Sequence, residues 1–333
     1  MNQLRIGIIG CGRMGQEHAR AATILGARVC LLYDFDISRS QMLADRYPAS
    51  IVLQDWKAID WRAIDAVFVC TPPSCRGPVE MSAASAGVPI FVEKPVGISA
   101  EQCRQLERAL KTTPVINSVG YMNRYRDSVL RAREFLAHRE PVGIACNWVC
   151  APYRVAWGSQ RDHSGGPFNE QATHFVDLCR FLMGEVVEVF AFALSKTSFD
   201  DTITVTLSFA NGALGTLLYS CRASDKQIGI RIFSTTGGLE LEGWDLRLKD
   251  DDGKKDYVED PYVKEDAAFF AAIEAADQSL IKSSVAEAIR TQMVVDAVHR
   301  SLLSRKPEKI ALKEKSSPQR RRERRGSAEV KQI

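Results

Sequence analysis

Short apolar runs in the first third of the chain alternate with segments of helical composition. The runs occupy residues 5–9, 29–33, 66–70, 89–92 and 115–119. They consist mainly of Val, Ile, Leu and Phe, a composition that is typical of buried strands. Because strands that alternate with helices indicate βαβ units, we predict an α/β fold with a doubly wound parallel sheet for residues 1–122.

The second half of the chain alternates apolar and polar residues with a period of two. Between residues 202 and 209, Ile, Val, Leu and Phe alternate with three threonines and a serine, which indicates a strand with one buried face. Asn211 and Gly212 signal a hairpin into a partner strand at 214–219. Further strands are expected at 227–234, 238–241 and 244–248, and helices at 128–137, 265–282 and 285–304. We therefore predict an α+β domain with a large, mostly antiparallel sheet over residues 123–312.

The composition is that of a globular protein. The chain has 333 residues, of which 45% are hydrophobic and 26% charged, and this length favours two domains. No apolar run approaches the roughly 20 residues that span a bilayer, and residues 4–10 are too short for a signal peptide, so we expect a cytoplasmic protein without a membrane partner. The nine cysteines form no Cys-x-x-Cys pair, which favours reduced, buried thiols over disulfides or zinc.

Positive charge is concentrated at the C-terminus. Residues 313–333 contain eight Lys or Arg and three Glu, an excess of five positive charges, whereas the whole chain has a net charge of +3. Residues 1–312 therefore carry a net charge of −2. Because a nucleic-acid-binding domain normally carries an excess of positive charge, nucleic acid is not an expected partner. Because the segment has few apolar residues, it cannot repay the entropy of ordering, and we predict a disordered tail.

A glycine-rich turn follows the first apolar run. Gly10, Gly12 and Gly15 form a G-x-G-x-x-G pattern between a predicted strand and a predicted helix. Glycines at these positions permit a tight turn, close approach of a pyrophosphate and close packing of helix on strand, while the helix N-terminus offers free N–H groups to phosphates. We therefore assign this loop, with Arg13 and Met14, to dinucleotide binding in a Rossmann domain.

Asp34 determines which dinucleotide is expected. It lies 19 residues after Gly15, at the end of the second predicted strand. A carboxylate there accepts hydrogen bonds from the adenosine ribose hydroxyls and repels a 2′-phosphate, so NAD is preferred over NADP. Arg39 is close enough in sequence to soften that repulsion, and a helix cap is the alternative role for Asp34. Thr71 and Pro72 follow a strand and are expected on the nicotinamide side, with a rigid turn as the alternative.

Glu93 and Lys94 follow the apolar run at residues 89–92. The carboxyl end of a strand is where doubly wound sheets hold their ligands. The ammonium of Lys94 can exchange a proton with a substrate there, which indicates chemistry in addition to binding. We assign both residues to the cofactor side of the pocket.

A second group of ionisable residues lies on a helix predicted after Gly165 and Gly166. At about 100° per residue, Glu170, His174 and Asp177 fall within about 60° of one another on one face. A histidine with a pKa near 6.5 suits proton transfer near neutral pH. The residues alone favour a surface stripe or a satisfied core histidine over a catalytic group. A metal site is not expected, because no cysteine or second histidine stands at ligand spacing.

Together these motifs resemble those of the glucose-fructose oxidoreductase, inositol dehydrogenase and rhizopine-catabolism (Gfo/Idh/MocA) family. The resemblance covers residues 3–312 and rests on the glycine pattern with His18, on Thr71-Pro72-Pro73, on Glu93-Lys94-Pro95, and on Gly165-Gly166 followed by Glu170, His174 and Asp177. It implies that Lys94 contacts substrate and assists proton transfer, and that His174 is the base. It further implies that Asp177 holds His174 or the substrate.

Several positions depart from the common pattern of this family. Glu170 stands where many relatives carry Asp, and Ala172 where many carry Gly, which leaves the substrate open. Arg76 replaces a frequent histidine, which suggests an anionic substrate group or a cofactor phosphate nearby. Substrate contacts inferred from position, with packing or surface roles as the alternative, are Tyr121, Asn123, Arg124, Tyr153, Arg154, Trp157 and Glu170.

The resemblance implies an NAD(P)-dependent oxidoreductase that transfers hydride between nicotinamide and a secondary alcohol or ketone of a sugar, cyclic polyol or sugar derivative. An NAD-retaining glycosidase of the same fold and a non-catalytic NAD(P)-binding sensor are the alternatives. The resemblance also implies a homodimer or homotetramer formed through the sheet of the second domain.

Overall fold

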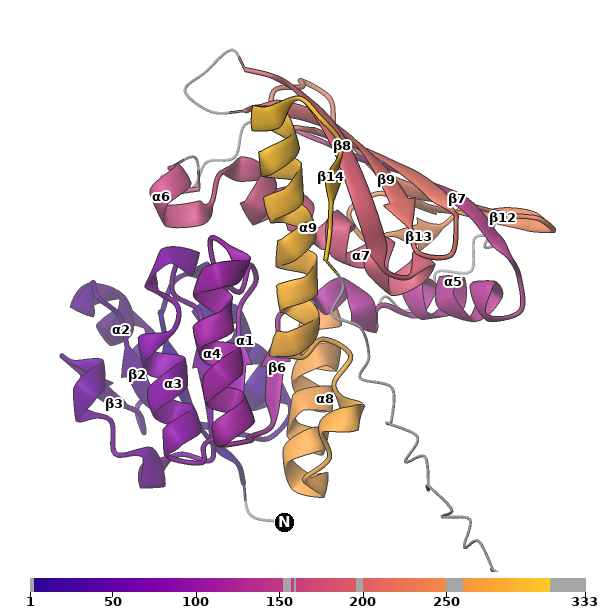
Figure 1. The fold of residues 1–333 in the computed structure, drawn as a ribbon. Helices are drawn as coiled ribbons and strands as arrows, with labels where there is room; N and C mark the ends of the chain where they lie inside the picture. The colour runs from indigo at the N-terminus through magenta and orange to yellow at the C-terminus, as the bar shows by residue number, and fades with distance from the viewer. Residues whose placement is uncertain (1–2, 152–156, 159, 196–199, 250–259, 312–333) are drawn as a thin grey trace, which may run out of the picture.

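The structure is a computed structural model that describes residues 3–151, 157–158, 160–195, 200–249 and 260–311. Two sheets lie in separate parts of the molecule, and a long helix runs between them (Figure 1). The basic tail lies outside the described residues. None of the described helices combines the length and apolar character needed to cross a membrane.

The first sheet has six parallel strands in the order β3-β2-β1-β4-β5-β6. Its strands are β1 (Arg5–Ile9), β2 (Arg28–Tyr33), β3 (Ile51–Leu53), β4 (Ala66–Val69), β5 (Ile90–Val92) and β6 (Asn117–Val119). The helices connecting them are α1 (Arg13–Ile24), α2 (Ile37–Ala44), α3 (Pro78–Ser85) and α4 (Ala100–Thr112). The strand order reverses between β1 and β4, so a crevice for ligands opens beyond their carboxyl ends. The predicted doubly wound parallel sheet is confirmed.

The second sheet has eight strands in the order β13-β12-β11-β7-β10-β9-β8-β14. Its strands are β7 (Pro141–Val149), β8 (Val186–Leu194), β9 (Thr202–Phe209), β10 (Leu214–Ser220), β11 (Gln227–Ser234), β12 (Gly237–Glu242), β13 (Arg247–Leu248) and β14 (Glu308–Lys309). Only β7 and β10 pair in parallel among the described strands of this sheet. Gly212, with φ of 88°, forms the predicted hairpin between β9 and β10. The mostly antiparallel second sheet is therefore confirmed.

Helices cover one face of the second sheet. These are α5 (Asp127–Ala137), α7 (Thr173–Met183) and the upper part of α9 (Val285–Ser304), while the short α6 (Arg161–Ser164) lies apart near the first domain (Figure 1). The apolar residues of β9 point toward these helices and are buried. On the other face, Leu214, Leu218 and Phe233 remain exposed.

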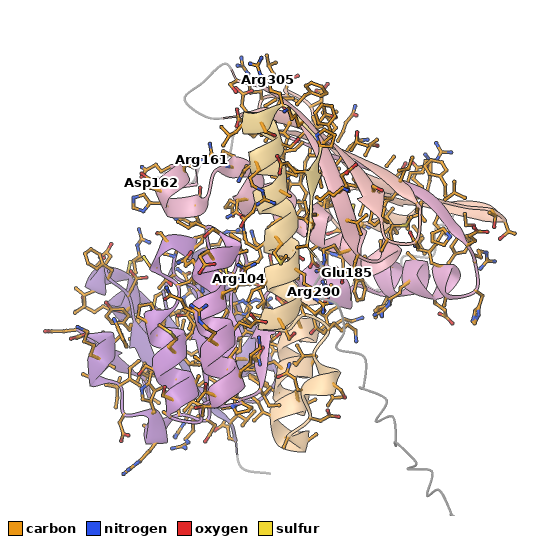
Figure 2. The ribbon with its side chains drawn as sticks, viewed as in Figure 1. Arg104, Arg161, Asp162, Glu185, Arg290 and Arg305 are labelled. Atoms are coloured by element: carbon orange, nitrogen blue, oxygen red, sulfur yellow. The ribbon has the colours of Figure 1, made fainter. Side chains whose placement is uncertain are left out.

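Two helices at the end of the chain join the two domains. On α8 (Pro261–Ala275), Phe269 packs edge-on against Phe68 and Phe91 of the first sheet, each 5.6 Å away between ring centroids. The first turns of α9 belong to the core of the first domain and its later turns to the core of the second. Arg290 of α9 also pairs with Glu185 at 3.1 Å (Figure 2). The cleft between the domains is therefore supported from one side by continuous helix.

Some element boundaries differ from the prediction. We expected a helix over 265–282, but α8 ends at Ala275, because Ala276 adopts a left-handed conformation and Asp277 caps a separate short turn. The expected strand at 244–248 is reduced to β13. The nine cysteines are free thiols, five of them buried and Cys75 exposed. We retain residue 122 as the predicted domain boundary.

Candidate active site

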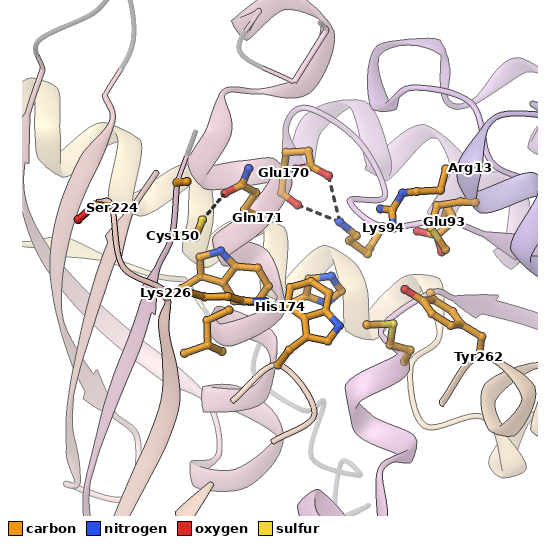
Figure 3. Close-up of a pocket in the computed structure, with 17 residues that line it drawn as sticks. Arg13, Glu93, Lys94, Cys150, Glu170, Gln171, His174, Ser224, Lys226 and Tyr262 are labelled. Carbon is orange, nitrogen blue, oxygen red and sulfur yellow. Dashed lines mark hydrogen bonds and ion pairs between the residues drawn. The ribbon is translucent and has the colours of Figure 1, made fainter. Parts of the chain in front are cut away.

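A cavity of about 610 Å³ lies between the two domains (Figure 3). The residues singled out from the sequence that line it are Arg13, Met14, Glu93, Lys94, Glu170 and His174. Lys94 and His174, which belong to separate motifs in separate domains, thus share one cavity. Of the three residues expected from the loop after β7, Trp157 is half-buried outside the cavity wall, and Tyr153 and Arg154 lie outside the described residues.

The glycine-rich loop between β1 and α1 fits a dinucleotide. Gly10 has φ of 93°, and a Cβ on Gly15 would lie 2.0 Å from the Gly10 carbonyl oxygen, so both glycines are required by close backbone contacts. A Cβ on Gly12 would meet no atom within 4 Å, and no side chain caps the start of α1. Free N–H groups at a helix N-terminus that face open space suit the diphosphate of NAD.

Asp34 connects the end of β2 to this loop. Its Oδ2 accepts a hydrogen bond from the N–H of Cys11 at 2.7 Å, and its Oδ1 accepts one from the N–H of Asp36 at 2.9 Å. A carboxylate has about four lone-pair sites, so capacity remains for ribose hydroxyls. The cap of α2 is Asp36, not Asp34. Arg39 is exposed and pairs with Asp36 at 3.4 Å, so its charge is directed to that carboxylate.

Thr71 lies beside the glycine-rich loop at the end of β4. Its Oγ1 is buried and has no hydrogen-bond partner among the described residues. A Cβ on Gly10 would lie 2.8 Å from the Thr71 nitrogen, which shows how closely the two segments approach. Thr71 can therefore bond to a cofactor held by the loop, whereas Pro72 caps the short turn η3 (Pro73–Cys75) and needs no ligand to explain it.

Arg76 does not face an anion site. Its guanidinium is buried, donates a hydrogen bond to the carbonyl of Val69, and lies 4.0 Å from the carboxylate of Glu80. The interpretation of Arg76 as a ligand for a phosphate or an anionic substrate is therefore wrong. A buried cation needs a partner, and this one has the protein's own carbonyl and carboxylate.

Glu93 lines the cavity and belongs to a buried ion-pair network with His18 and Asp266. Its Oε1 lies 3.0 Å from Nε2 of His18, and Nδ1 of His18 lies 3.0 Å from Asp266 on α8. Burial alone would lower the pKa of His18, but the charges and hydrogen bonds of Asp266 and Glu93 raise it well above 6.5. His18, Glu93 and Glu265 bring ligand-type atoms within 4.8 Å of one another, but both ring nitrogens of His18 already have carboxylate partners. The group is therefore a structural link between the domains.

Lys94 reaches from the end of β5 to the second domain. Its Nζ donates hydrogen bonds to the main-chain carbonyl of Glu170 at 2.9 Å and to Oε1 of the same residue at 3.2 Å (Figure 3). Glu170 lies in a π-helical turn (Phe168–Ala172) that precedes α7. The projection of Glu170 onto a regular helix therefore does not apply, because the turn interrupts the 3.6-residue repeat. Wide turns of this kind are frequent at functional sites.

His174 lies in the first turn of α7 and is buried against Trp148. The two rings are 5.9 Å apart and nearly parallel, at 14°. Nδ1 of His174 has no hydrogen-bond partner in the part of the chain that the structure describes. Burial lowers the pKa of His174 well below 6.5, and the positive charges of Lys94, Arg126 and Arg13 lower it further. The imidazole is therefore neutral near pH 7 and can accept a proton.

Asp177 does not contact His174 or the cavity. Its carboxylate accepts two hydrogen bonds from Arg124, both at 2.7 Å, and one from the hydroxyl of Thr291 at 2.9 Å. Both charged side chains are buried. The assignments of Asp177 to the histidine and of Arg124 to the substrate are wrong, because each charge neutralises the other inside the protein.

Tyr121 and Asn123 are also buried behind the wall. The hydroxyl of Tyr121 lies 2.8 Å from that of Thr173, at the start of α7. Oδ1 of Asn123 accepts a hydrogen bond from Nε of Arg126 at 2.7 Å. Neither side chain lines the cavity, so both support the site instead of contacting a substrate directly.

Most of the cavity wall that the second domain contributes was not predicted from the sequence. Trp148 on β7, Lys226 before β11 and Trp244 after β12 line the cavity, as does Tyr262 at the start of α8. No motif marks these residues. Their positions follow from strand pairing, such as the register that places Trp148 opposite Ile228, and that register is not visible in a local pattern.

Residues 4–121 match the model of an oxidoreductase family with an NAD-binding Rossmann fold, and residues 141–240 match the GFO/IDH/MocA C-terminal domain. The inositol 2-dehydrogenase of Rhizobium meliloti (strain 1021) is 27% identical, over 92% of this chain and 99% of its own.

Two solved structures share the fold at lower identity. Levoglucosan dehydrogenase in complex with NADH and levoglucosan has a TM-score of 0.84 and 20% identity, covering 93% of this chain and 100% of its own. The WlbA dehydrogenase from Bordetella pertussis, in complex with NADH and UDP-GlcNAcA, has a TM-score of 0.82 at 20% identity with the same coverage. With two family models covering most of the chain and a glycine loop shaped for a dinucleotide, the protein belongs to the GFO/IDH/MocA family of NAD-binding oxidoreductases.

Proposed function

We propose that the protein is a dehydrogenase that interconverts a secondary alcohol and a ketone on a sugar, a cyclic polyol or a sugar derivative. The observation that carries the proposal is the presence of Lys94 and His174 on one cavity beside the dinucleotide loop. The names of its relatives support the substrate class, since one is an inositol 2-dehydrogenase and a protein of similar fold binds levoglucosan.

His174 and Lys94 divide the handling of the proton and the charge. NAD, when bound, supplies the hydride acceptor. His174 takes the hydroxyl proton, since its imidazole is neutral and Nδ1 has no partner among the described residues. An ammonium has three N–H donors, of which Glu170 engages two, so Lys94 keeps one to hold the substrate oxygen and stabilise its developing negative charge.

The preferred cofactor in this proposal is NAD. The carboxylate of Asp34 lies at the end of β2, and it repels a 2′-phosphate placed at the adenosine ribose. Arg39 offers little compensation because Asp36 already engages its guanidinium.

A substrate screen tests the proposal. Sugars, inositols, sugar phosphates and nucleotide sugars are incubated with the protein and either NAD or NADP, and reduced nicotinamide is followed by absorbance. Accumulation of reduced nicotinamide with a sugar or polyol is the expected result. If product forms without net reduction of NAD or NADP, the protein is a cofactor-retaining glycosidase and not a dehydrogenase. If no substrate reacts, the protein is a non-catalytic NAD(P)-binding protein.

The exposed face of the second sheet supports a homodimer or homotetramer. Phe192 is 61% exposed and Leu214 is 59% exposed, although such residues on one sheet face are normally covered. Light scattering on the purified protein measures its mass, and a monomer at micromolar concentration would contradict this proposal. Leu214→Glu should shift an oligomer toward monomer.

A further inference from the structure

Lys226 lines the cavity toward the end opposite the dinucleotide loop (Figure 3). Figure 3 shows Lys226 toward one end and Arg13 at the other, with His174 and Lys94 between them. A substrate placed at the two proton-handling residues therefore has the dinucleotide on one side and Lys226 on the other.

Among the residues that the structure describes, no acidic group neutralises the charge of Lys226. No carboxylate of the residues that the structure describes forms an ion pair with it, and its Nζ lies 4.7 Å from the ring centroid of Trp244. Lys94 and Glu93 on the same wall differ in this respect, since Lys94 pairs with Glu170 and Glu93 pairs with His18. Contact with an aromatic ring holds an ammonium in place without cancelling its charge.

Two tryptophans form an aromatic corner beside Lys226. The rings of Trp148 and Trp244 are 5.4 Å apart at 64°, and Trp148 also stacks on His174. Aromatic faces pack against the C–H faces of sugar rings.

A second cavity of about 370 Å³ adjoins the first at Lys226 and Trp244. Its two carboxylates, Glu240 and Glu242, both pair with Lys249, at 3.1 Å and 2.9 Å. They therefore leave Lys226 without a competing partner there. The junction has room for a charged substituent that extends from the sugar ring.

We propose that the substrate carries an anionic group, a carboxylate or a phosphate, which Lys226 binds while the ring packs on Trp148 and Trp244. The inference rests on the proposed function, because it places the reacting carbon at Lys94 and His174. It narrows the substrate class to acidic or phosphorylated sugar derivatives.

The test measures binding by tryptophan fluorescence of the NADH-loaded protein. The probes are glucuronate, glucose 6-phosphate and glucose, which share a ring and differ in charge. We expect at least one anionic probe to bind about tenfold more tightly than glucose, because the ion pair with Lys226 is absent for glucose. Tighter binding of glucuronate would indicate a carboxylate on the substrate, and tighter binding of glucose 6-phosphate would indicate a phosphate.

Matched variants assign the effect to Lys226. Lys226→Met should remove the preference and Lys226→Arg should keep it, while Lys57→Met, at an exposed lysine of the first domain, should change nothing. If glucose binds as tightly as both anionic probes, or if Lys226→Met retains the preference, the proposal is overturned.

The binding readout separates this proposal from the proposed function. Preferential binding through Lys226 without reduced nicotinamide from any substrate would support the anionic subsite and refute the dehydrogenase. In turnover, Lys226→Met should raise KM for the anionic substrate about tenfold and leave kcat within about twofold, since Lys226 does not contact the reacting carbon. An unchanged KM for the anionic substrate in Lys226→Met, with turnover retained, would overturn the subsite alone.

Discussion

The ammonium of Lys94 donates two hydrogen bonds to a single residue, Glu170. One goes to the main-chain carbonyl at 2.9 Å and the other to the carboxylate at 3.2 Å. The contact crosses from the end of β5 to the π-helical turn before α7, so it joins the two domains at the cavity. It also orients the remaining N–H donor of the lysine.

Replacing Lys94 should separate chemistry from cofactor binding. We expect Lys94→Ala to lower kcat by about 100-fold or more, since it removes the group that stabilises the substrate oxygen. The Kd for NADH, measured by fluorescence titration, should stay within about threefold, since the glycine-rich loop is untouched. Lys111→Ala, at an exposed lysine of α4, serves as the control. Unchanged turnover in Lys94→Ala would remove Lys94 from the mechanism.

The low pKa of His174 predicts the pH dependence of alcohol oxidation. Burial and then the charges of Lys94, Arg126 and Arg13 lower this pKa below 6.5, so the base stays deprotonated as pH falls through 6.5. The acid limb of kcat/KM should therefore lie below pH 6.5, and His174→Gln should abolish it together with most of the activity.

The exposed histidine of α6 provides a control for this profile. His163→Gln should reproduce the wild-type pH dependence, because its side chain is exposed and outside the cavity wall. An acid limb centred at or above pH 6.5 in the wild type would show that His174 is not the titrating base.

Local patterns predicted the parts of the site that a few adjacent residues determine. The glycine-rich loop and the strand end before Lys94 depend on backbone conformation, which short motifs specify. Asp177 shows the limit of this reasoning. Helical periodicity predicts the helix face on which Asp177 lies, but it does not predict that Arg124 is the residue that binds its carboxylate. Trp148 and Lys226 reach the cavity through strand register in a sheet of distant segments, so no motif marks them.

The pair of Arg124 and Asp177 should contribute to stability. Arg124→Met leaves a buried carboxylate without its partner, and we expect a loss of about 3–5 kcal/mol in the free energy of unfolding, measured in urea. The double variant Arg124→Met/Asp177→Leu should recover part of that loss because no buried charge remains. If the losses of the two single variants simply add in the double variant, the residues are not energetically coupled.

The network around His18 predicts a stability term that depends on pH. Asp266 and Glu93 raise the folded pKa of His18 above its unfolded value near 6.5. The protonated histidine therefore contributes its full stabilisation below pH 6.5 and loses it as pH rises through the folded pKa. The difference in Tm between the wild type and His18→Gln should be large near pH 6 and shrink toward alkaline pH.

His138→Gln is the matched control for this measurement, since His138 is exposed at the end of α5. Its Tm should follow the wild type at every pH. A difference between the wild type and His18→Gln that grows with pH would contradict a raised pKa for His18.

Asp34 should set the ratio of NADH to NADPH affinity. The wild type is expected to bind NADH about tenfold more tightly than NADPH, because one carboxylate at the ribose repels the 2′-phosphate. Asp34→Asn should narrow the ratio, since the amide oxygen still accepts from the N–H of Cys11 while the charge is gone. The ratio of NADH to NADPH affinity is the appropriate readout, because loosening of the glycine-rich loop would lower the affinity for both cofactors equally.

Arg39→Met distinguishes this explanation from one in which an arginine selects the cofactor. The guanidinium of Arg39 pairs with Asp36 at 3.4 Å, so its removal should leave the ratio of NADH to NADPH affinity unchanged. A fall in NADPH affinity alone would show that Arg39 leaves Asp36 to meet the phosphate. Tighter binding of NADPH than of NADH by the wild type would contradict the expected preference for NAD. A cation other than Arg39 would then have to screen the carboxylate of Asp34, because Arg39 pairs with Asp36.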